Sequence, residues 1–240
     1  MSGSDHTAQP DALIRTEDGR NYWEGVGADV NGMLGGVTSV AGFSNISKVD
    51  LQGSRSFLAK LGIGSKNGRR IVANALEGGA GIGRVTEGLL ADVAEQMDVI
   101  EPVANFTKTL QAKKGVRNVF SVGLEDWMPE QGILYDLIWT QWCVGYLNDE
   151  QLLQYLERCR EVLKPDGGLI IVKENLTTSG VDLFDEADSS VTREDGKFQT
   201  IFQQAGLRIV KSEIQKGFPK TFPRRLFPVK MYALKPKSKM

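Results

Sequence analysis

The sequence predicts an α/β fold, in which a doubly wound, seven-stranded, mostly parallel sheet carries helices on both faces. Apolar runs alternate with helical patterns from residue 68 onward, and the connections between them are short. A glycine-rich turn follows the first apolar run. The 240 residues, 41% hydrophobic and 25% charged, fit one α/β domain with a short extension.

The segments before this alternation indicate a helical extension. Residues 16–26 begin a short helix that carries Tyr22 and Trp23, and NGMLGG at 31–36 is a glycine-rich turn. Residues 49–62 repeat leucine and phenylalanine at near-helical spacing up to a glycine. We therefore divide the chain into a flexible polar tail (1–17), a helical extension that contributes to a substrate site (18–62) and the main domain (63–240).

Seven apolar segments are the expected strands of the main domain: 68–79, 97–102, 116–127, 135–142, 168–175, 207–215 and 229–236. The expected helices are 84–96, 148–168 and 197–206. Asn148 or Asp149 can cap the second of these helices, and Pro165 and Gly167 end it. Only a loop separates the last two strands, so they should pair antiparallel.

Composition excludes several classes of protein. The formal net charge is −1, so no global field draws the chain to nucleic acid or to a membrane. The first ten residues lack the apolar core of a signal peptide, and no apolar run reaches membrane-spanning length. Cys143 and Cys159 lie far apart, which favours buried thiols in the reducing cytoplasm or nucleus. We expect no metal site.

The stretch LEGGAGIGRVTEGLL at 76–90 predicts a nucleotide-binding turn between a strand and a helix. Arg84 follows it where a phosphate-binding P-loop would need Lys and Ser or Thr. Gly79, Gly81 and Gly83 alternate as G-x-G-x-G, not as the dinucleotide pattern G-x-G-x-x-G. A tight turn without a ligand is the structural alternative.

Two further features favour a nucleotide cofactor. Glu101 ends the second strand, where an acid can bind ribose hydroxyls. GLEDW at 123–127 follows the third strand, where a polar and an apolar residue can flank an adenine ring. The glycine turn and the two acids together are similar to the Rossmann-like methyltransferases that use S-adenosylmethionine (SAM).

From about residue 21 to 236 the chain resembles one family, the eukaryotic α-N-terminal protein methyltransferases, in a fungal-type form. The matching stretches are YWEGVGADVNGMLGG, GGAGIGR, GLEDW, DLIWTQWCVGYL, KEN and FDEADSSVTR. The resemblance implies that SAM methylates the free α-amine of proteins that begin Xaa-Pro-Lys, ribosomal proteins among them. It also implies a monomer with neither a membrane nor a nucleic-acid partner.

The resemblance assigns three groups of site residues. It places the cofactor on Gly79, Gly81, Arg84, Glu101, Pro102, Val103, Leu124, Glu125 and Gln141. It places the peptide beside Tyr22, Trp23, Leu34, Gly35, Trp142, Asp185 and Ser190. The catalytic group comprises Asp188, Asn175 and Tyr146.

These residue types suit methyl transfer, which needs a neutral amine aligned behind the sulfonium carbon. An α-amine has a pKa of about 7.7–8.0, so a base helps only modestly. We expect Asp188 to hold the ammonium and take its proton, and Asn175 to fix the first peptide carbonyl. Trp142 would lie against the substrate proline, and Tyr22 and Trp23 would close over the amine.

The segment 182–195 carries six acids against Arg193 alone, which complements a substrate with an α-ammonium and a lysine. Some of these acids can instead only cap or solvate the loop. The basic segment from Lys211 onward is expected to be a solvated face.

Tyr146 departs from the family, which usually has a histidine at this position. The one histidine of the chain is His6, in the polar tail. Tyrosine, with a pKa near 10, is a poor base at neutral pH. Three interpretations stay open: Asp188 works alone, Tyr146 positions the reacting groups, or the chain binds SAM or N-termini with weak or no turnover. A methyltransferase for a small amine is a further alternative, against which the extension and the charged loop argue.

Overall fold

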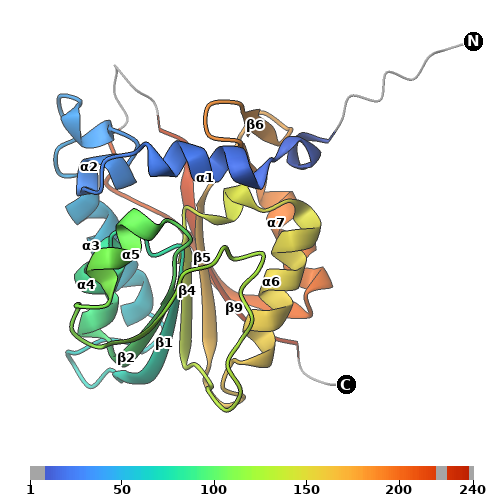
Figure 1. The fold of residues 1–240 in the computed structure, drawn as a ribbon. Helices are drawn as coiled ribbons and strands as arrows, with labels where there is room; N and C mark the ends of the chain where they lie inside the picture. Colours follow the sequence, from blue (N-terminus) through green and yellow to red (C-terminus); the bar gives the residue numbers. More distant parts are fainter. Residues whose placement is uncertain (1–8, 220–225, 238–240) are drawn as a thin grey trace, which may run out of the picture.

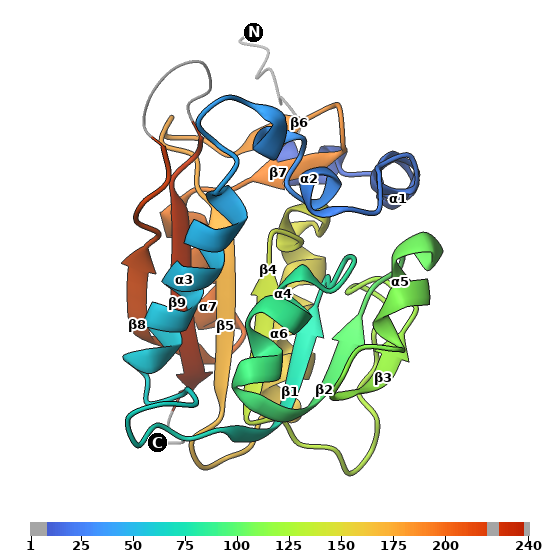
Figure 2. The same cartoon turned by 90° about the vertical axis from the view of Figure 1, so that its left-hand side faces the viewer.

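The computed structural model describes residues 9–219 and 226–237. Its strands are β1 (Val72–Gly78), β2 (Ala94–Ile100), β3 (Val116–Phe120), β4 (Leu137–Gln141), β5 (Leu169–Asn175), β8 (Leu207–Ile214) and β9 (Val229–Pro236). They form a seven-stranded sheet in the order β3-β2-β1-β4-β5-β9-β8 (Figures 1 and 2). Strands β1 to β5 pair in parallel, and β9 runs antiparallel to both β5 and β8. The predicted fold class and the predicted antiparallel pair are confirmed.

The two faces of the sheet each pack against helices. On one face α6 (Asp149–Glu161) and α7 (Asp195–Gln204) bury an apolar core against strand residues such as Ile138. On the other face α3 (Ile46–Ala59) and α4 (Arg84–Gly88) cover a second core that contains Trp139. Successive residues of β4 therefore point to opposite cores, as the period of a strand requires. Trp139 fills the core as its alternation along the strand suggested.

Two predicted features of α6 can be compared with the structure. Asn148 is the N-cap: its side chain accepts a hydrogen bond from the Gln151 amide, and the Gln151 side chain accepts one from the Asn148 amide. Two backbone donors that the helix leaves free are thereby satisfied. The helix ends at Glu161, before the predicted stop at Pro165.

The structure corrects the prediction of one helix over 84–96. The helix α4 ends at Gly88, because Leu89 has an extended φ of −139°. One 3-10 turn, η3 (Leu90–Asp92), follows, and residues 94–96 already belong to β2. Leu89 and Leu90 are both buried. Their apolar side chains therefore match the helical sequence pattern, although their backbone is no longer helical.

One helix and one hairpin of the main domain were also not predicted. They are the short helix α5 (Ala104–Leu110) and the two strands of a hairpin, β6 (Leu183–Asp185) and β7 (Ser190–Thr192). The helix buries only two apolar side chains, and the hairpin lies in the acidic segment. Neither has the apolar periodicity on which the prediction depends.

The N-terminal extension lies at the carboxyl ends of the parallel strands. It comprises the 3-10 turn η1 (Pro10–Leu13), α1 (Thr16–Glu24), α2 (Val30–Met33), the 3-10 turn η2 (Val37–Ser39) and α3. Figure 1 shows α1 crossing above β4 and β5.

Residues 9–17 of the predicted tail belong to this packed structure. The Asp11 carboxylate accepts a hydrogen bond from the Asp149 amide at 3.0 Å, and the Arg15 amide donates to Ser189 Oγ at 2.8 Å. His6 and the rest of residues 1–8 lie outside the described residues. Within the described part of the chain, no helix is long and apolar enough to cross a membrane.

Candidate active site

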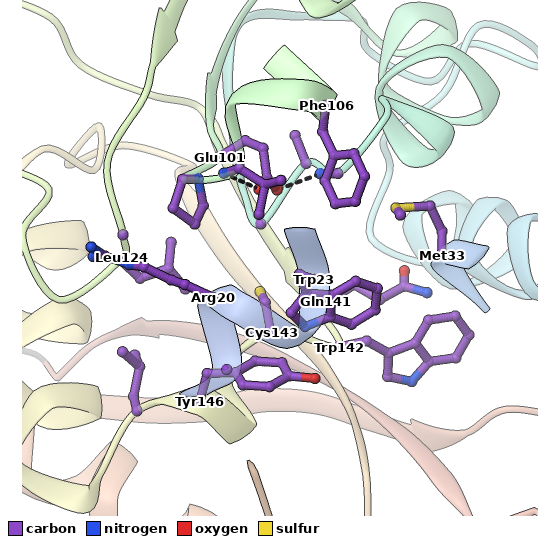
Figure 3. A pocket seen from close by; sticks show the side chains of 18 of the residues that line it. Arg20, Trp23, Met33, Glu101, Phe106, Leu124, Gln141, Trp142, Cys143 and Tyr146 are labelled. Atoms are coloured by element: carbon purple, nitrogen blue, oxygen red, sulfur yellow. Dashed lines mark hydrogen bonds between the residues drawn. The ribbon is translucent and has the colours of Figure 1, made fainter. Parts of the chain in front are cut away.

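A cleft beneath α1 opens at the carboxyl ends of the central strands and encloses about 1040 Å³, partly open to solvent (Figure 3). All nine predicted cofactor residues line it: Gly79, Gly81, Arg84, Glu101, Pro102, Val103, Leu124, Glu125 and Gln141. Ligands bind at this edge of doubly wound sheets, where the chain connections diverge from the central strands.

The glycine turn shapes the floor of the cleft. Gly79, Gly81 and Gly83 have φ values of 69°, 56° and 85°. A Cβ on Gly79 would lie 2.5 Å from the Cβ of Cys143, and one on Gly81 would lie 2.6 Å from the sulfur of Met33. The alternate glycines are therefore required both by the backbone conformation and by close contacts.

Glu101 lies where β2 ends, and its carboxylate is fixed in place. Its two oxygens accept hydrogen bonds from the amides of Gly81 at 2.7 Å and Val103 at 2.9 Å (Figure 3). Burial raises the pKa of Glu101, while these two amides lower it. A carboxylate has about four acceptor positions, so two remain for ribose hydroxyls.

The β4 end of the cleft carries N–H donors and a cation. The side-chain oxygen of Gln141 accepts a hydrogen bond from the Trp139 indole at 3.2 Å. The side-chain nitrogen of Gln141 is therefore the donor. The guanidinium of Arg84 also lines the cleft at this end. The cleft thus has an acid at the β2 end and a cation at the β4 end. This distribution fits SAM, whose ribose hydroxyls and amino-acid carboxylate lie on opposite sides of the sulfonium.

Helix α1 is tethered over the cleft. Arg20 forms ion pairs with Glu125 at 2.7 Å and with Asp126 at 3.4 Å, beyond the end of β3. Trp23 contacts Tyr146 and Phe106 edge to face, with ring centroids 6.2 and 6.5 Å apart. The helix therefore covers the space between the glycine turn and Tyr146.

Trp142 follows β4 with a positive φ of 55°, which is rare outside glycine. Its buried indole N–H has no hydrogen-bond partner within residues 9–219 and 226–237. The Arg84 guanidinium lies 5.4 Å from the ring centroid. Strained backbone and an unsatisfied donor are typical of functional sites.

A buried carboxylate supports the turn that follows Trp142. Glu174 Oε1 accepts hydrogen bonds from the amides of Cys143 at 2.8 Å and Val144 at 3.2 Å. Burial raises the pKa of Glu174 to about 7, against the lowering effect of these amides. This residue lies in the KEN stretch, where only the neighbouring Asn175 was predicted to function.

Tyr146 and Asp188 form a hydrogen-bonded pair. The Tyr146 hydroxyl donates to Asp188 Oδ2 at 2.7 Å, and Asp188 Oδ1 accepts from the Ser190 amide at 3.2 Å and its hydroxyl at 2.7 Å. Burial, together with the Asp188 charge, raises the pKa of Tyr146 far above its usual value. Tyr146 is therefore a protonated donor and not a base at neutral pH.

Arg193 fixes the position of this pair and was not predicted. It is fully buried, and its guanidinium donates to the carbonyls of Val144, at 3.0 Å, and Leu147, which flank Tyr146. Its Nε also donates to the Asp149 carboxylate at 2.9 Å. The arginine therefore joins the end of the β6–β7 hairpin to the Tyr146 turn.

Several acids of the segment 182–195 have structural partners. Asp182 accepts from the Glu194 amide at 2.8 Å, and Asp195 pairs with Lys230 at 2.8 Å. Asp185 is exposed, and among the described residues it accepts a side-chain hydrogen bond only from the nearby Ala187 amide. Asp182 thus caps the loop, as one alternative expected, whereas Asp195 joins α7 to β9.

The structure places some predicted residues outside the cleft. Trp23, Trp142 and Tyr146 line it, whereas Tyr22, Leu34, Gly35, Asn175, Asp185, Asp188 and Ser190 do not. Of these, Asp188 and Ser190 adjoin the cleft through Tyr146. Leu34 packs into a small apolar cluster with Val37 and Phe43, and Asn175 is half-buried at the end of β5.

Other lining residues were not predicted as site residues. They are Arg15, Thr16, Gly19, Arg20, Met33, Glu77, Ala80, Val85, Phe106, Gly123, Cys143, Leu147 and Ser189. Burial raises the pKa of Glu77 to about 8, and its carboxyl accepts from the Thr86 hydroxyl at 2.6 Å. Glu77 immediately precedes the glycine turn, a position that could have indicated it. Both cysteines are free, and burial raises their thiol pKa values.

Comparisons with known proteins agree with this geometry. A family model described as AdoMet-dependent proline di-methyltransferase matches residues 11–235. An α N-terminal protein methyltransferase 1 of Schizosaccharomyces pombe is 44% identical over 223 residues, which cover 92% of this chain and 96% of that protein. An N-terminal Xaa-Pro-Lys N-methyltransferase 1 of Danio rerio is 39% identical over 207 residues, 84% of this chain and 88% of that protein.

Solved structures show the same fold. A SAM-dependent methyltransferase of Leishmania major superposes with a TM-score of 0.79 at 36% identity, covering 92% of this chain and 82% of that one.

Proposed function

This chain belongs to the family of AdoMet-dependent proline di-methyltransferases, and we propose that it methylates the free α-amine of proteins that begin Xaa-Pro-Lys. The observation that carries this proposal is the Tyr146–Asp188 pair, 2.7 Å apart, beside a cleft built on the glycine turn. The names of the relatives supply the substrate class.

The residues of the cleft would hold SAM along its length. Glu101 would accept from the ribose hydroxyls, Leu124 and Glu125 would flank the adenine, and Arg84 and Gln141 would donate to the carboxylate. When bound, SAM supplies a methyl group on a sulfonium, which leaves as a neutral thioether. No oxyanion hole is therefore needed, and positioning supplies much of the rate acceleration.

The proton chemistry falls to Asp188. Its carboxylate would hold the substrate ammonium and take or relay one proton, while Tyr146 and Ser190 fix its orientation through the hydrogen bonds described above. Since the pKa of an α-amine is about 7.7–8.0, part of the substrate is already neutral near pH 7.4. A histidine that acts as general base is therefore not essential, and we propose that activity is retained with Tyr146.

The peptide would lie on the open side of the cleft. We propose that Trp142 packs against the proline and that its free indole N–H meets a peptide carbonyl. Asn175 would fix the first carbonyl, Tyr22 and Trp23 would close over the amine, and the exposed Asp185 would face the substrate lysine. Leu34 and Gly35 would support this side of the cleft from the extension.

The cellular setting is a further part of the proposal. We propose that the chain acts as a monomer in the cytoplasm or nucleus on substrates that include ribosomal proteins, without nucleic acid. The free cysteines support a reducing compartment, and the net charge of −1 gives no general attraction to nucleic acid. The ribosomal substrates depend on the family resemblance.

The test is a product-mass measurement on defined peptides. The purified chain is incubated with SAM and peptides that begin Ser-Pro-Lys, Pro-Pro-Lys or Ala-Pro-Lys. An N-acetylated peptide and a Ser-Ala-Lys peptide are the controls. We expect added methyl groups on the free Xaa-Pro-Lys termini and none on the acetylated control.

Other results would lead to different conclusions. If SAM raises the melting temperature but no peptide gains mass, the chain binds the cofactor and either acts on another amine or does not turn over. If SAM gives neither protection nor product, the assignment of the cleft is wrong.

A further inference from the structure

Asp50 of α3 is a buried carboxylate that contacts both donor side chains at the β4 end of the cleft. Its side chain is fully buried and does not itself line the cleft. Asp50 Oδ2 accepts from Arg84 Nη1 at 2.8 Å, and both oxygens lie 3.0–3.1 Å from Gln141 Nε2. One carboxylate therefore joins the extension, the residue after the glycine turn and the end of β4.

These contacts determine what Gln141 presents to the cleft. The carbonyl oxygen of its amide is used by the Trp139 indole, and one N–H is used by Asp50. The amide cannot flip without losing both hydrogen bonds. Its remaining N–H, together with the other N–H groups of Arg84, makes this end of the cleft a site for an anion.

Asp50, Arg84 and Lys173 form a charged cluster, and its net charge supports the same conclusion. Lys173 Nζ lies 2.5 Å from Asp50 Oδ1, and it also donates to the Asp50 carbonyl, Ser54 and Gln215, none of which lines the cleft. One carboxylate against two cations leaves a single positive charge. Because Lys173 of β5 is fully buried and does not line the cleft, whereas Arg84 does, a ligand meets this charge on Arg84.

We propose that Asp50 is a positioning residue for the amino-acid end of SAM. It aims the N–H groups of Arg84 and Gln141 at the carboxylate, the one anionic group of the cofactor, without touching the cofactor itself. This inference rests on the proposed function. It makes α3 a part of the cofactor site, in addition to the contribution of the extension to the peptide site.

The test compares two ligands that differ at this end. S-adenosylhomocysteine has the amino-acid group, whereas 5′-methylthioadenosine lacks it but keeps the adenosine part. Their dissociation constants are measured by titration calorimetry on the full chain and on the double variant Asp50→Asn/Lys173→Met. The double variant keeps the single positive charge of the cluster, so a change in affinity reports orientation and not charge.

We expect the double variant to bind S-adenosylhomocysteine about tenfold more weakly, as for the loss of oriented hydrogen bonds to a charged group. Its affinity for 5′-methylthioadenosine should change by less than about twofold. Lys60→Ala is the control, because Lys60 pairs with Glu213 at 2.7 Å on the surface and also joins the end of α3 to the sheet. It should leave both affinities unchanged.

Three results would contradict either the positioning role of Asp50 or the proposed function. An unchanged affinity for S-adenosylhomocysteine in the double variant, or an equal loss for both ligands, overturns the positioning role. If the parent chain binds neither ligand, the proposed function itself fails. Should the double variant not fold, Asp50→Asn alone is measured; it adds one positive charge to the cluster, so a ligand-selective loss for S-adenosylhomocysteine against that added charge still reports orientation.

Discussion

At the residue scale, the proposed role of Tyr146 is to orient Asp188, the group proposed to take the substrate proton. Its hydroxyl is a donor to Asp188 and has a pKa raised by burial, so it cannot take a proton from an ammonium at neutral pH. What it can do is hold the carboxylate in one orientation. We therefore propose that Tyr146 acts through geometry.

This role gives a prediction for Tyr146→Phe. We expect kcat to fall about tenfold, because one hydrogen bond to a charged group is lost, while Ser190 still holds Asp188. The shape of the pH profile should not change, since the lost hydroxyl does not titrate in the working range. Steady-state kinetics from pH 6 to 9 on a Pro-Lys peptide would measure both.

Tyr146→His is the matched variant. An imidazole has an unperturbed pKa of about 6.5, so it should add a titration near that pH to the profile. A changed pH profile in Tyr146→Phe, or an unchanged one in Tyr146→His, would contradict a purely positioning role.

Some residues of the site can be predicted from the sequence and others cannot, for physical reasons. Gly79 and Glu101 were predictable because the turn demands positive φ and because an acid follows a buried strand. Asp50 and Arg193 were not predictable, because a charged residue within a helix or a hairpin usually faces solvent. Their partners come from distant elements, and only the folded chain shows the pairing.

At the element scale, α6 offers a clean test of local stabilisation. Asn148→Ala removes the acceptor for the Gln151 amide, 2.8 Å away, and breaks the reciprocal capping pair. The loss should lower the free energy of unfolding by about 1 kcal/mol. Urea denaturation measures it.

Gln154→Ala is the control within the same helix. Gln154 is exposed, and its side chain donates to the Glu150 side chain within the same helix, so its replacement should change stability by less than about 0.5 kcal/mol. An equal loss in both variants would show that the capping pair contributes nothing specific.

The elements that could be predicted share one property. β4 and β5 are buried on both faces and therefore read as continuous apolar runs. The hairpin β6–β7 is held by ion pairs and hydrogen bonds to other elements, and α4 ends where tertiary packing of Leu89 outweighs helix propensity. Such elements depend on tertiary contacts, which a local sequence pattern does not indicate.

At the scale of the whole molecule, two buried carboxyls set how stability varies with pH. Burial raises the pKa of Glu77 to about 8 and that of Glu174 to about 7. The folded state therefore favours their protonated forms. Their stabilising contribution is complete below the unfolded value of about 4.3 and is lost as the pH rises through 7 and 8.

We accordingly expect the free energy of unfolding to fall between about pH 5 and pH 8 in the absence of ligand. Glu174→Gln should flatten this slope by up to about 1.4 kcal/mol per pH unit, because its amide oxygen still accepts hydrogen bonds but does not titrate. Chemical denaturation at several pH values measures the slope.

Glu213→Gln is the comparison for this experiment. Hydrogen bonding to Lys60 lowers the pKa of Glu213, so its contribution is constant above about pH 5. This variant should keep the slope of the parent chain. A parent stability that does not vary over this range would show that neither buried carboxyl titrates as described.

The strand order of the sheet has a consequence for synthesis on the ribosome. β8 is made before β9, yet it joins the sheet only through β9, which lies between it and β5. Until Val229–Pro236 emerge from the exit tunnel, β8 has no neighbour and the edge of β5 stays open. A nascent chain interrupted between these two strands would leave both the edge of β5 and β8 without their hydrogen-bonding partner, so completion of the sheet depends on translation of β9.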